Sequence, residues 1–408
     1  MSFDKIRARI RKVSARHGAA SEQVRGLNVP YSRRGEMAIP AFKMPSGGDP
    51  AVDGRAHSLK LMAKAAPLPV DFFFYDLEAA APDNETYKQF AREFVVEALT
   101  ANDFGNRVVA FRPNNIRTPF FEEDVLQVLS GAGHRLQALV IPKSETADEV
   151  RDVAKIVNRI NKLAGHDNKL WLEVLIESPR AFTQAAQIAA IPEVSALIFG
   201  AWDFARTVGG EVSADNWIRD QQTARQLLPI YAASEGKEAI DAVTGTLPIR
   251  PVRPADMTPE DFQAALDGTA SDLARYPADF LEKIQTRRHA LDLAARDARD
   301  ARAVGFAAKW ILHPDQIEVI QGAWVPSRKR ALEALNLTAA YTRAALSGSG
   351  AEVDGNRLAD KAVVGTDWWI VLNGMKGGVL GDDDFGATGY SFEQLQRTVV
   401  TRDAQVAR

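Results

Sequence analysis

The sequence predicts a TIM-type (β/α)8 barrel, and three features of the chain support this prediction. Eight short apolar runs are spread along the 408 residues, segments of helical length separate most of them, and polar residues stand at or near the C-terminal ends of most runs. This rhythm is typical of parallel strands that alternate with helices, and the C-terminal strand ends then form the active-site face. The predicted strands are 38–43, 71–78, 107–114, 138–143, 170–178, 196–203, 238–245 and 307–314.

The segments before and just after the first strand have distinct compositions. Residues 1–36 are predicted to form a helix and loop, and their basic, polar start lacks the apolar stretch of a secretory signal. Residues 44–54 are rich in Gly and Pro, which predicts an irregular loop on the catalytic face. Such a loop either approaches a phosphate closely or is simply mobile, because it lacks the spacing of a phosphate-binding loop.

The later elements follow from periodicity and capping signals. Ser178 and Pro179 predict the start of a helix over 181–190. Residues 252–288 are longer than a barrel connection needs, so we expect a helical insertion after strand seven, followed by a helix over 289–304. Further helices are expected at 316–321, 329–346, 356–369 and 391–398, the last within an extended tail. The predicted units are an N-terminal segment (1–36), the barrel (37–322) and a C-terminal helical lid and tail (323–408).

Composition excludes several classes of function. The net charge of −3 argues against a nucleic acid or an anionic membrane as the main partner. No apolar run approaches the roughly 20 residues that a membrane span needs. The chain has no cysteine, which excludes thiolate catalysis, disulfides and thiolate metal sites. A cytoplasmic location is compatible with this composition and is our expectation.

Two carboxylates predict a metal site. Glu177 ends the fifth predicted strand and Asp203 ends the sixth, so both are expected at one mouth of the barrel. Two oxygen ligands with room for water suit Mg²⁺, with Mn²⁺ as the alternative. The competing interpretation is that each carboxylate is merely solvated at a strand end.

A second group of charges is expected beside this site. Asp76 and Glu78 share a face at the end of strand two, and Arg112 ends strand three. A guanidinium beside a metal is well shaped to hold a carboxylate or enolate oxygen, although a structural ion pair with the same acids is the alternative. Lys143 is expected to balance the carboxylates, to touch substrate or to support Glu177. His313 precedes a proline, which favours a structural or ligand-rim role over catalysis.

These motifs, taken in order, resemble a known family. They are Asp76-Leu77-Glu78, Arg112 with the segment 118–124, Pro142-Lys143-Ser144-Glu145, Ile176-Glu177-Ser178, the segment 199–203 and the segment 305–314 that contains Lys309-Trp310-Ile311-Leu312-His313-Pro314. Over roughly residues 60–370 the chain resembles the citrate lyase β-subunit/malyl-CoA lyase branch of the HpcH/HpaI aldolase superfamily. The resemblance implies a barrel with a C-terminal extension, assembled as a trimer or hexamer, and Mg²⁺-dependent cleavage or formation of a C–C bond beside a CoA thioester.

The resemblance also assigns roles to individual residues. It implies that Glu177 and Asp203 bind the metal, that Arg112 grips the 2-oxo acid, and that Asp76 and Glu78 form the acidic pair of strand two. Asp360 falls on the family's catalytic aspartate, which reaches a neighbouring subunit's site and acts as acid or base.

The sequence departs from the family pattern at three places near the expected site. Ala79 replaces a second acid, and Trp202 stands where a smaller or acidic residue is common. The CoA-seating loop lacks its usual arginine, so the basic contact is expected at Lys43, Lys60 or Lys64.

The sequence therefore predicts a Mg²⁺-dependent C–C lyase that acts on a β-hydroxyacyl-CoA and releases a 2-oxo acid and an acyl-CoA. One alternative is an aldolase of hydroxy-oxo acids that does not use CoA. The other is a catalytically quiet barrel that binds a metabolite or a partner protein. The chain is expected to form a homotrimer or homohexamer and to bind neither nucleic acid nor membrane.

Overall fold

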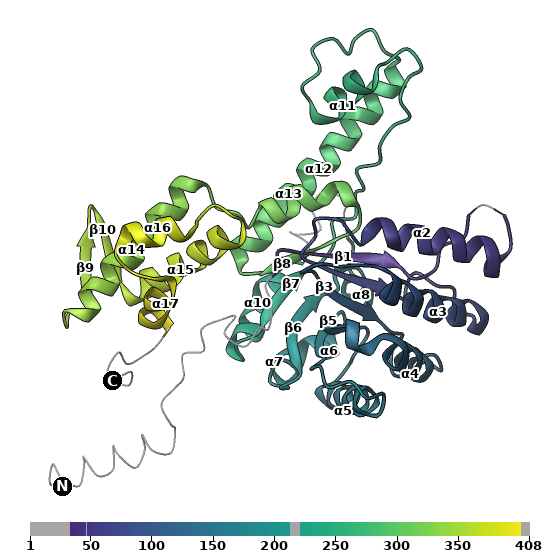
Figure 1. Ribbon diagram of the computed structural model, residues 1–408, viewed down its shortest axis with the longest axis horizontal. Coiled ribbons are helices and arrows are strands. Elements are labelled where there is room, and N and C mark those ends of the chain that lie inside the picture. Colours follow the sequence, from purple (N-terminus) through teal and green to yellow (C-terminus); the bar gives the residue numbers. More distant parts are fainter. Residues whose placement is uncertain (1–32, 46, 213–220, 401–408) are drawn as a thin grey trace.

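The computed structural model describes residues 33–45, 47–212 and 221–400, and its centre is a closed barrel of eight parallel strands (Figure 1). Each strand pairs with the next in sequence, and β1 pairs with β8 to close the barrel. The predicted fold class is confirmed, whereas the helix expected before the first strand falls mostly in residues 1–32, outside the described residues. The strands are β1 (Gly35–Pro40), β2 (Phe72–Asp76), β3 (Val108–Arg112), β4 (Ala138–Ile141), β5 (Trp171–Ile176), β6 (Val194–Phe199), β7 (Glu238–Asp241) and β8 (Ala308–Ile311).

Helices surround the barrel between successive strands, and their ends follow the capping signals of the sequence. Ser178 caps the helix after β5, because its Oγ accepts a hydrogen bond from the backbone N–H of Ala181. The region 50–54, predicted as irregular, is instead a helical turn capped by Asp49 that continues into α2. The helices are α2 (Arg55–Ala65), α3 (Glu85–Ala101), α4 (Phe121–Ala132), α5 (Ala147–Leu163), α6 (Pro179–Thr183), α7 (Ala185–Ala189), α8 (Ala201–Val208) and α10 (Gln222–Ser234).

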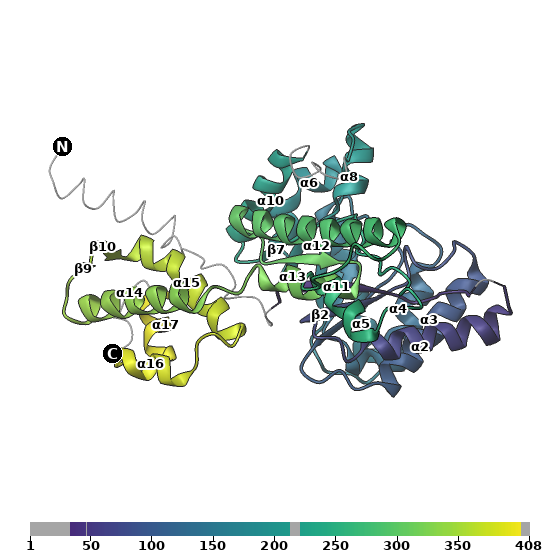
Figure 2. The same ribbon diagram turned by 90° about the horizontal axis from the view of Figure 1, so that it is seen from above.

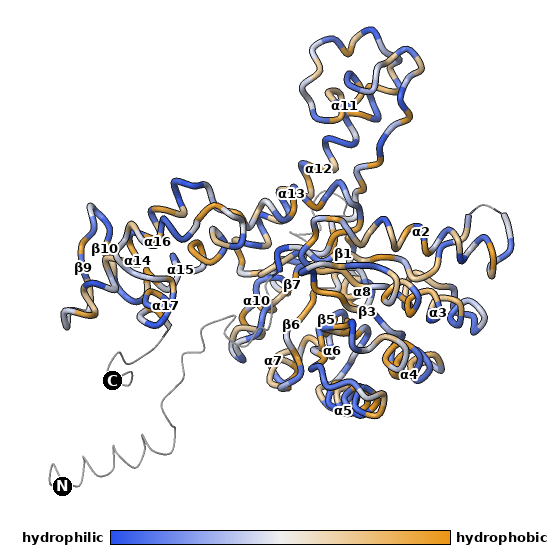
Figure 3. Tube along the Cα trace, in the orientation of Figure 1, coloured by the Kyte–Doolittle hydropathy of each residue, from blue (hydrophilic) through white to orange (hydrophobic). Residues whose placement is uncertain are grey.

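The main core lies between the strands and these helices, and a second apolar cluster fills the inside of the barrel. Figure 3 shows apolar residues along β5 and β6 and a mixture of apolar and polar residues along the outer helix α5. The inside of the barrel also holds buried charges at the N-terminal ends of the strands. Arg33 lies 2.6 Å from Glu36 and 3.1 Å from Glu173. Burial and the charge of Glu173 raise the pKa of Glu36 well above its usual range.

The chain between β7 and β8 forms an arm that projects from the barrel at the top of Figure 1. It contains α11 (Pro259–Asp267) and the first part of α12 (Ala278–Val304), a 27-residue helix that merges two predicted helices. The arm has a small apolar core of its own, made by Met257, Ala265, Leu266, Tyr276, Phe280 and Ile284. It is therefore a folded insertion and not an irregular loop.

A cluster of charges anchors the base of the arm beside the end of β8. Arg250 forms two 2.8 Å hydrogen bonds with the carboxylate of Asp315, and Nη2 of Arg287 lies 2.9 Å from the same group. Burial acts to raise the pKa of Asp315, but the hydrogen bonds and charges of the two arginines outweigh it and bring the pKa to about 2.

This anchor predicts a measurable dependence of stability on pH. The pKa of Asp315 is lower in the folded chain than in the unfolded chain, so its carboxylate stabilises the fold above pH ~4 and loses this effect toward pH ~2. The stability of the wild type minus that of Asp315→Asn, measured by urea unfolding, should therefore be constant above about pH 5 and shrink as the pH falls from about 5 toward 2. Asp279→Asn, which removes an exposed ion pair on α12, the helix that carries Arg287, is the control. A difference that did not change between pH 5 and pH 3 would show that the arginines do not hold Asp315 ionised.

The C-terminal unit stands beside the barrel and has its own apolar core (Figures 1 and 2). After α13 (Ile317–Gly322) it comprises α14 (Arg328–Leu346), β9 (Ala351–Asp354), β10 (Arg357–Asp360), α15 (Lys361–Lys376), α16 (Asp382–Thr388) and α17 (Phe392–Val400). The hairpin β9–β10 replaces the start of the predicted helix 356–369, and Gly355 turns it with a φ of +61°. In the described part of the tail, the helix expected at 391–398 is present as α17, and a further helix, α16, stands where extended chain was expected.

The apolar segment Trp368-Trp369-Ile370-Val371 is covered largely within its own unit. Trp368 is buried against Phe392, and Val371 is also buried there. Trp369 faces a cavity shared with the barrel. The segment is therefore no evidence for an oligomer. No helix among the described residues is long and apolar enough to cross a membrane.

Candidate active site

The C-terminal ends of the strands, here called the mouth, bring together a paired arginine and aspartate. Strand pairing places Asp76 directly beside Arg112 on β2 and β3. Nε and Nη2 of Arg112 donate to the two oxygens of Asp76, at 2.8 and 2.7 Å. The guanidinium also lies over the rings of Phe74 and Trp310, 5.7 and 5.5 Å from their centres. Arg112 is thus fixed at the floor of the mouth.

This pairing leaves part of Arg112 available for an anion. The guanidinium has five N–H donors, and Asp76 takes two of them. Nη1 lies 3.5 Å from Oε2 of Glu78. Burial acts to lower the pKa of Arg112, but the charge and hydrogen bonds of Asp76 raise it, so the group stays charged. The predicted ion pair with the acids of strand two is present, and the role of Arg112 toward substrate stays a prediction.

Lys143 joins Glu78 to Glu177. Its ammonium lies 2.5 Å from Oε1 of Glu78, and its backbone N–H donates to Oε1 of Glu177 at 2.5 Å. Burial acts to lower the pKa of Lys143, but Glu78 raises it. Of the expected roles, balancing the carboxylates and supporting Glu177 are both visible in these contacts.

Glu177 and Asp203 are the two carboxylates predicted to bind metal. Glu177 is buried, and Asp203 lies in the first turn of α8, not at the end of β6 as predicted, because β6 ends at Phe199. The close approach of this turn requires Gly200, since a Cβ there would lie only 2.4 Å from the Cβ of Glu177. Asp203 pairs with Arg206 one turn later.

The electrostatics of this pair suit a divalent cation. Burial raises the pKa of Glu177 to about 7, the charge of Asp203 acts in the same direction, and the hydrogen bond from Lys143 opposes them. A divalent cation held by both carboxylates would offset this unfavourable burial of negative charge. No group of three or more Asp, Glu or His side chains in the described ranges could hold a metal. Two protein oxygens with water and substrate completing the shell is the arrangement typical of Mg²⁺.

The remaining predicted residues lie at the rim or away from it. His313 caps a short helix through Nδ1, which accepts the N–H of Asp315. The structural or rim role expected of His313 agrees with this contact. Lys43, just after β1, and Lys60, on α2, are exposed. Their expected contact with an acyl carrier stays a prediction.

Asp360 does not lie in the mouth of its own barrel. It caps α15 by accepting the N–H of Val363. Residues of α15 line a cavity with Arg33, Glu238 and Ala307, which lie at or beside the N-terminal ends of barrel strands. Figures 1 and 2 both show β10 on the side of the C-terminal unit away from the barrel. Asp360 is therefore not placed to act in the mouth of its own barrel.

Sequence reasoning missed several residues that hold the mouth in shape. Lys88 is buried on α3 and donates to the carbonyl oxygens of Leu77 and Glu78, at 2.7 and 3.1 Å. Arg117, in the loop after β3, donates to the carbonyl oxygen of Lys143 at 2.5 Å. The only available signal was the presence of a lysine on the apolar face of a helix and a basic residue in a loop after a strand.

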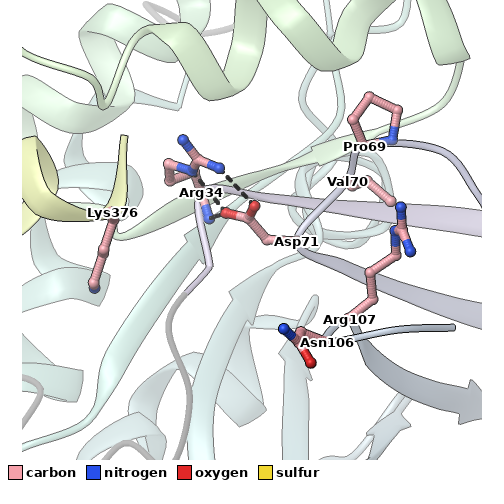
Figure 4. Close-up of a pocket in the computed structure, with 7 residues that line it drawn as sticks. All are labelled: Arg34, Pro69, Val70, Asp71, Asn106, Arg107 and Lys376. Carbon is pink, nitrogen blue, oxygen red and sulfur yellow. Dashed lines mark hydrogen bonds and ion pairs between the residues drawn. The ribbon is translucent and has the colours of Figure 1, made fainter. Parts of the chain in front are cut away.

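The opposite end of the barrel carries a separate cavity (Figure 4). It measures about 440 Å³, and Arg34 pairs with Asp71 through hydrogen bonds of 2.8 and 2.7 Å. It contains none of the predicted site residues. Its lining residues are Arg34, Pro69, Val70, Asp71, Asn106, Arg107 and Lys376.

Comparison with known proteins identifies the family. Residues 55–271 match the family model described as HpcH/HpaI aldolase/citrate lyase. The chain belongs to this family. The L-malyl-CoA/beta-methylmalyl-CoA lyase of Cereibacter sphaeroides (strain ATCC 17025) is 30% identical over 317 residues, which are 74% of this chain and 87% of that protein. The citrate lyase subunit beta of Escherichia coli (strain K12), 26% identical over 297 residues that are 72% of this chain and 83% of that protein, is also named a lyase, and this chain is an enzyme of that type.

Solved structures agree with the fold. A citrate lyase from Burkholderia xenovorans LB400 superposes with a TM-score of 0.60 at 18% identity, covering 91% of this chain and 98% of that chain. The protein CitE from Mycobacterium tuberculosis, solved with magnesium, acetoacetate and coenzyme A, gives a TM-score of 0.54 at 23% identity and covers 84% and 98%. At these identities the likeness establishes the fold alone.

Proposed function

We propose that this enzyme is a Mg²⁺-dependent C–C lyase that cleaves a β-hydroxyacyl-CoA to a 2-oxo acid and an acyl-CoA. The observation that carries the proposal is the placement of Arg112 beside Glu177 and Lys143 at the mouth, next to the turn that carries Asp203. This combination offers a fixed cation for the carboxylate of an oxo acid and two oxygens for a metal. The CoA-ester names of related lyases support the choice of substrate class.

The roles of the chain's own residues follow from their contacts. Glu177 and Asp203 would hold the metal, which would supply positive charge near the reacting oxygens. Arg112, fixed by Asp76, would bind the substrate carboxylate through its remaining N–H donors. Lys143 would keep Glu78 and Glu177 in place, and Lys43, Lys60 and His313 are the candidates for contacts with the acyl carrier.

Cleavage balances as a retro-aldol reaction. The β-hydroxyl gives its proton to a carboxylate or a water at the mouth, the C–C bond breaks, and the electron pair of that bond passes to the thioester as an enolate while the 2-oxo acid leaves. A proton is then delivered to the enolate carbon, which yields the acyl-CoA. Asp360 of a neighbouring subunit is the proposed donor, and by reversibility it removes the α-proton in the synthetic direction.

A direct assay tests the proposal. The full-length chain with Mg²⁺ should form a 2-oxo acid and an acyl-CoA in equal amounts from malyl-CoA, citramalyl-CoA or citryl-CoA, and chelation by EDTA should stop the reaction. Cleavage of a CoA-free hydroxy-oxo acid alone would favour the alternative aldolase. Thermal stabilisation by oxo acids without turnover of any substrate would favour the quiet metabolite-binding barrel.

The proposed role of Asp360 predicts complementation between inactive variants. Because Asp360 lies away from its own mouth, Asp360→Ala and Arg112→Ala should each be inactive, yet mixed oligomers should recover activity. A restored site needs Arg112 from one chain and Asp360 from its neighbour. In a randomly mixed homotrimer or homohexamer this holds at roughly a quarter of the shared sites. Co-expression and activity assay of the mixed oligomer measure this recovery. A fully active monomer by light scattering would exclude shared sites, and an oligomer without recovery would remove Asp360 from the neighbour's site.

A further inference from the structure

Lys143 has an unusual backbone conformation. Its φ is +53°, and no other residue except glycine has a positive φ in the part of the chain that the structure describes. This left-handed conformation is unfavourable for a residue with a Cβ. Such conformations persist only where the surroundings hold them, and they gather at functional sites.

The conformation has a clear geometric result. In this conformation the backbone N–H of Lys143 donates to Oε1 of Glu177 at 2.5 Å while the side chain reaches Glu78 on another loop. The other oxygen of Glu177 faces Gly200, at the start of the turn that carries Asp203. The N–H therefore fixes one oxygen of Glu177 and sets the direction of the other. Because φ is the rotation about the N–Cα bond, its left-handed value sets the directions of the Lys143 side chain and carbonyl group relative to this N–H.

Two contacts from the loop after β3 hold this backbone. Nη2 of Arg117 donates to the carbonyl oxygen of Lys143 at 2.5 Å, and Nη1 of Arg117 is held by Glu149 at 2.6 Å. Nδ2 of Asn115 donates to the carbonyl oxygen of Pro142 at 2.8 Å. Together with the ion pair to Glu78, these contacts fix the peptide groups on both sides of the Lys143 Cα.

We infer that Lys143 is a positioning residue whose left-handed backbone, held by Arg117 and Glu78, orients Glu177 to bind a divalent cation. This inference rests on the proposed function, because Glu177 is the metal ligand there. Arg117 acts through Lys143 and does not touch the cation. An electrostatic role of the ammonium alone would require no particular backbone conformation at residue 143.

Comparing Lys143→Ala with Lys143→Gly separates these roles. Both variants lose the ammonium and its pair with Glu78. Only alanine, which has a Cβ, is strained at a φ of +53°. Glycine adopts a φ of +53° freely and keeps its N–H on Glu177, whereas the alanine backbone is expected to relax. The glycine variant should therefore bind Mg²⁺ or Mn²⁺ about tenfold more tightly than the alanine variant, as measured by calorimetry on the full-length chain. In the absence of metal, the melting temperature of the glycine variant should also be no lower than that of the alanine variant.

Arg117→Ala tests how the strain is held. It should weaken cation binding about tenfold, because it removes a hydrogen bond from a group that supports a metal ligand. In the Lys143→Gly background the same substitution should have little further effect, because glycine needs no support in this conformation. Arg151→Ala, which removes an exposed arginine from the neighbouring helix α5, is the control. Circular dichroism would confirm that each variant is folded.

The outcomes separate this inference from the proposed function. If the wild-type chain binds neither Mg²⁺ nor Mn²⁺, the proposed metal site fails and the inference fails with it. If the wild type binds the cation and the glycine variant binds no more tightly than the alanine variant, the inference alone is overturned. The inference would also be contradicted if the Arg117→Ala, Lys143→Gly double variant bound the cation about tenfold more weakly than Lys143→Gly alone.

Discussion

Glu177→Gln is expected to abolish Mg²⁺-dependent activity and to weaken Mg²⁺ binding by at least about a hundredfold, because a direct ligand should matter more than its supporting groups. Glutamine has the same shape, and its Oε1 can still accept the N–H of Lys143. The substitution therefore removes charge with little change in packing. Calorimetry of Mg²⁺ binding and an assay of oxo-acid release measure the two effects.

The stability of the metal-free variant adds a second readout. Glu177 is buried near the like charge of Asp203. Removing one of two crowded carboxylates should leave the melting temperature of the metal-free chain unchanged or higher, and Mg²⁺ should no longer raise it. Glu122→Gln on the exposed surface of α4 is the control. Wild-type Mg²⁺ affinity in Glu177→Gln would refute the metal assignment.

The barrel could be predicted because its strands are almost wholly buried. Segments such as β2 and β3 are buried at every position, so they read as continuous apolar runs between helices. The strand ends were less certain, because the polar residues after each run belong to loops or helices. Asp203 shows this: it follows the apolar run of β6 but lies in the first turn of α8. Its proximity to Glu177 survives the shift, because both follow adjacent strands.

The parts that could not be predicted depend on contacts distant in sequence. The hairpin β9–β10 is short, and its exposed residues Val353 and Leu358 give no clear alternation of burial. The burial of Trp368 depends on Phe392, which lies on another helix. The left-handed conformation of Lys143 has no local signal, because glycine or asparagine would be expected there. It is determined by Arg117 and Glu78, on other loops.

Arg112→Lys is expected to produce the second large effect, a loss of about 2–5 kcal/mol in kcat/KM. The guanidinium uses two N–H groups to hold Asp76 and retains others for the substrate, and a lysine ammonium cannot do both in the same plane. The loss should therefore appear both as a higher KM for the oxo acid in the synthetic direction and as a lower kcat. Steady-state kinetics with varied oxo acid separates these two effects.

A matched pair elsewhere in the barrel separates this effect from a general loss of structure. Arg225 holds Asp241 with the same two-point geometry, at 3.0 and 2.8 Å, and both residues are buried. Asp241 ends β7, but its partner comes from α10, on the outer side of the barrel. Arg225→Lys should therefore lower stability by an amount similar to Arg112→Lys while leaving the KM for the oxo acid near its wild-type value. If both variants lose activity and stability in the same proportion, or if Arg112→Lys keeps wild-type kinetics, Arg112 is a structural residue and the substrate carboxylate binds elsewhere in the mouth.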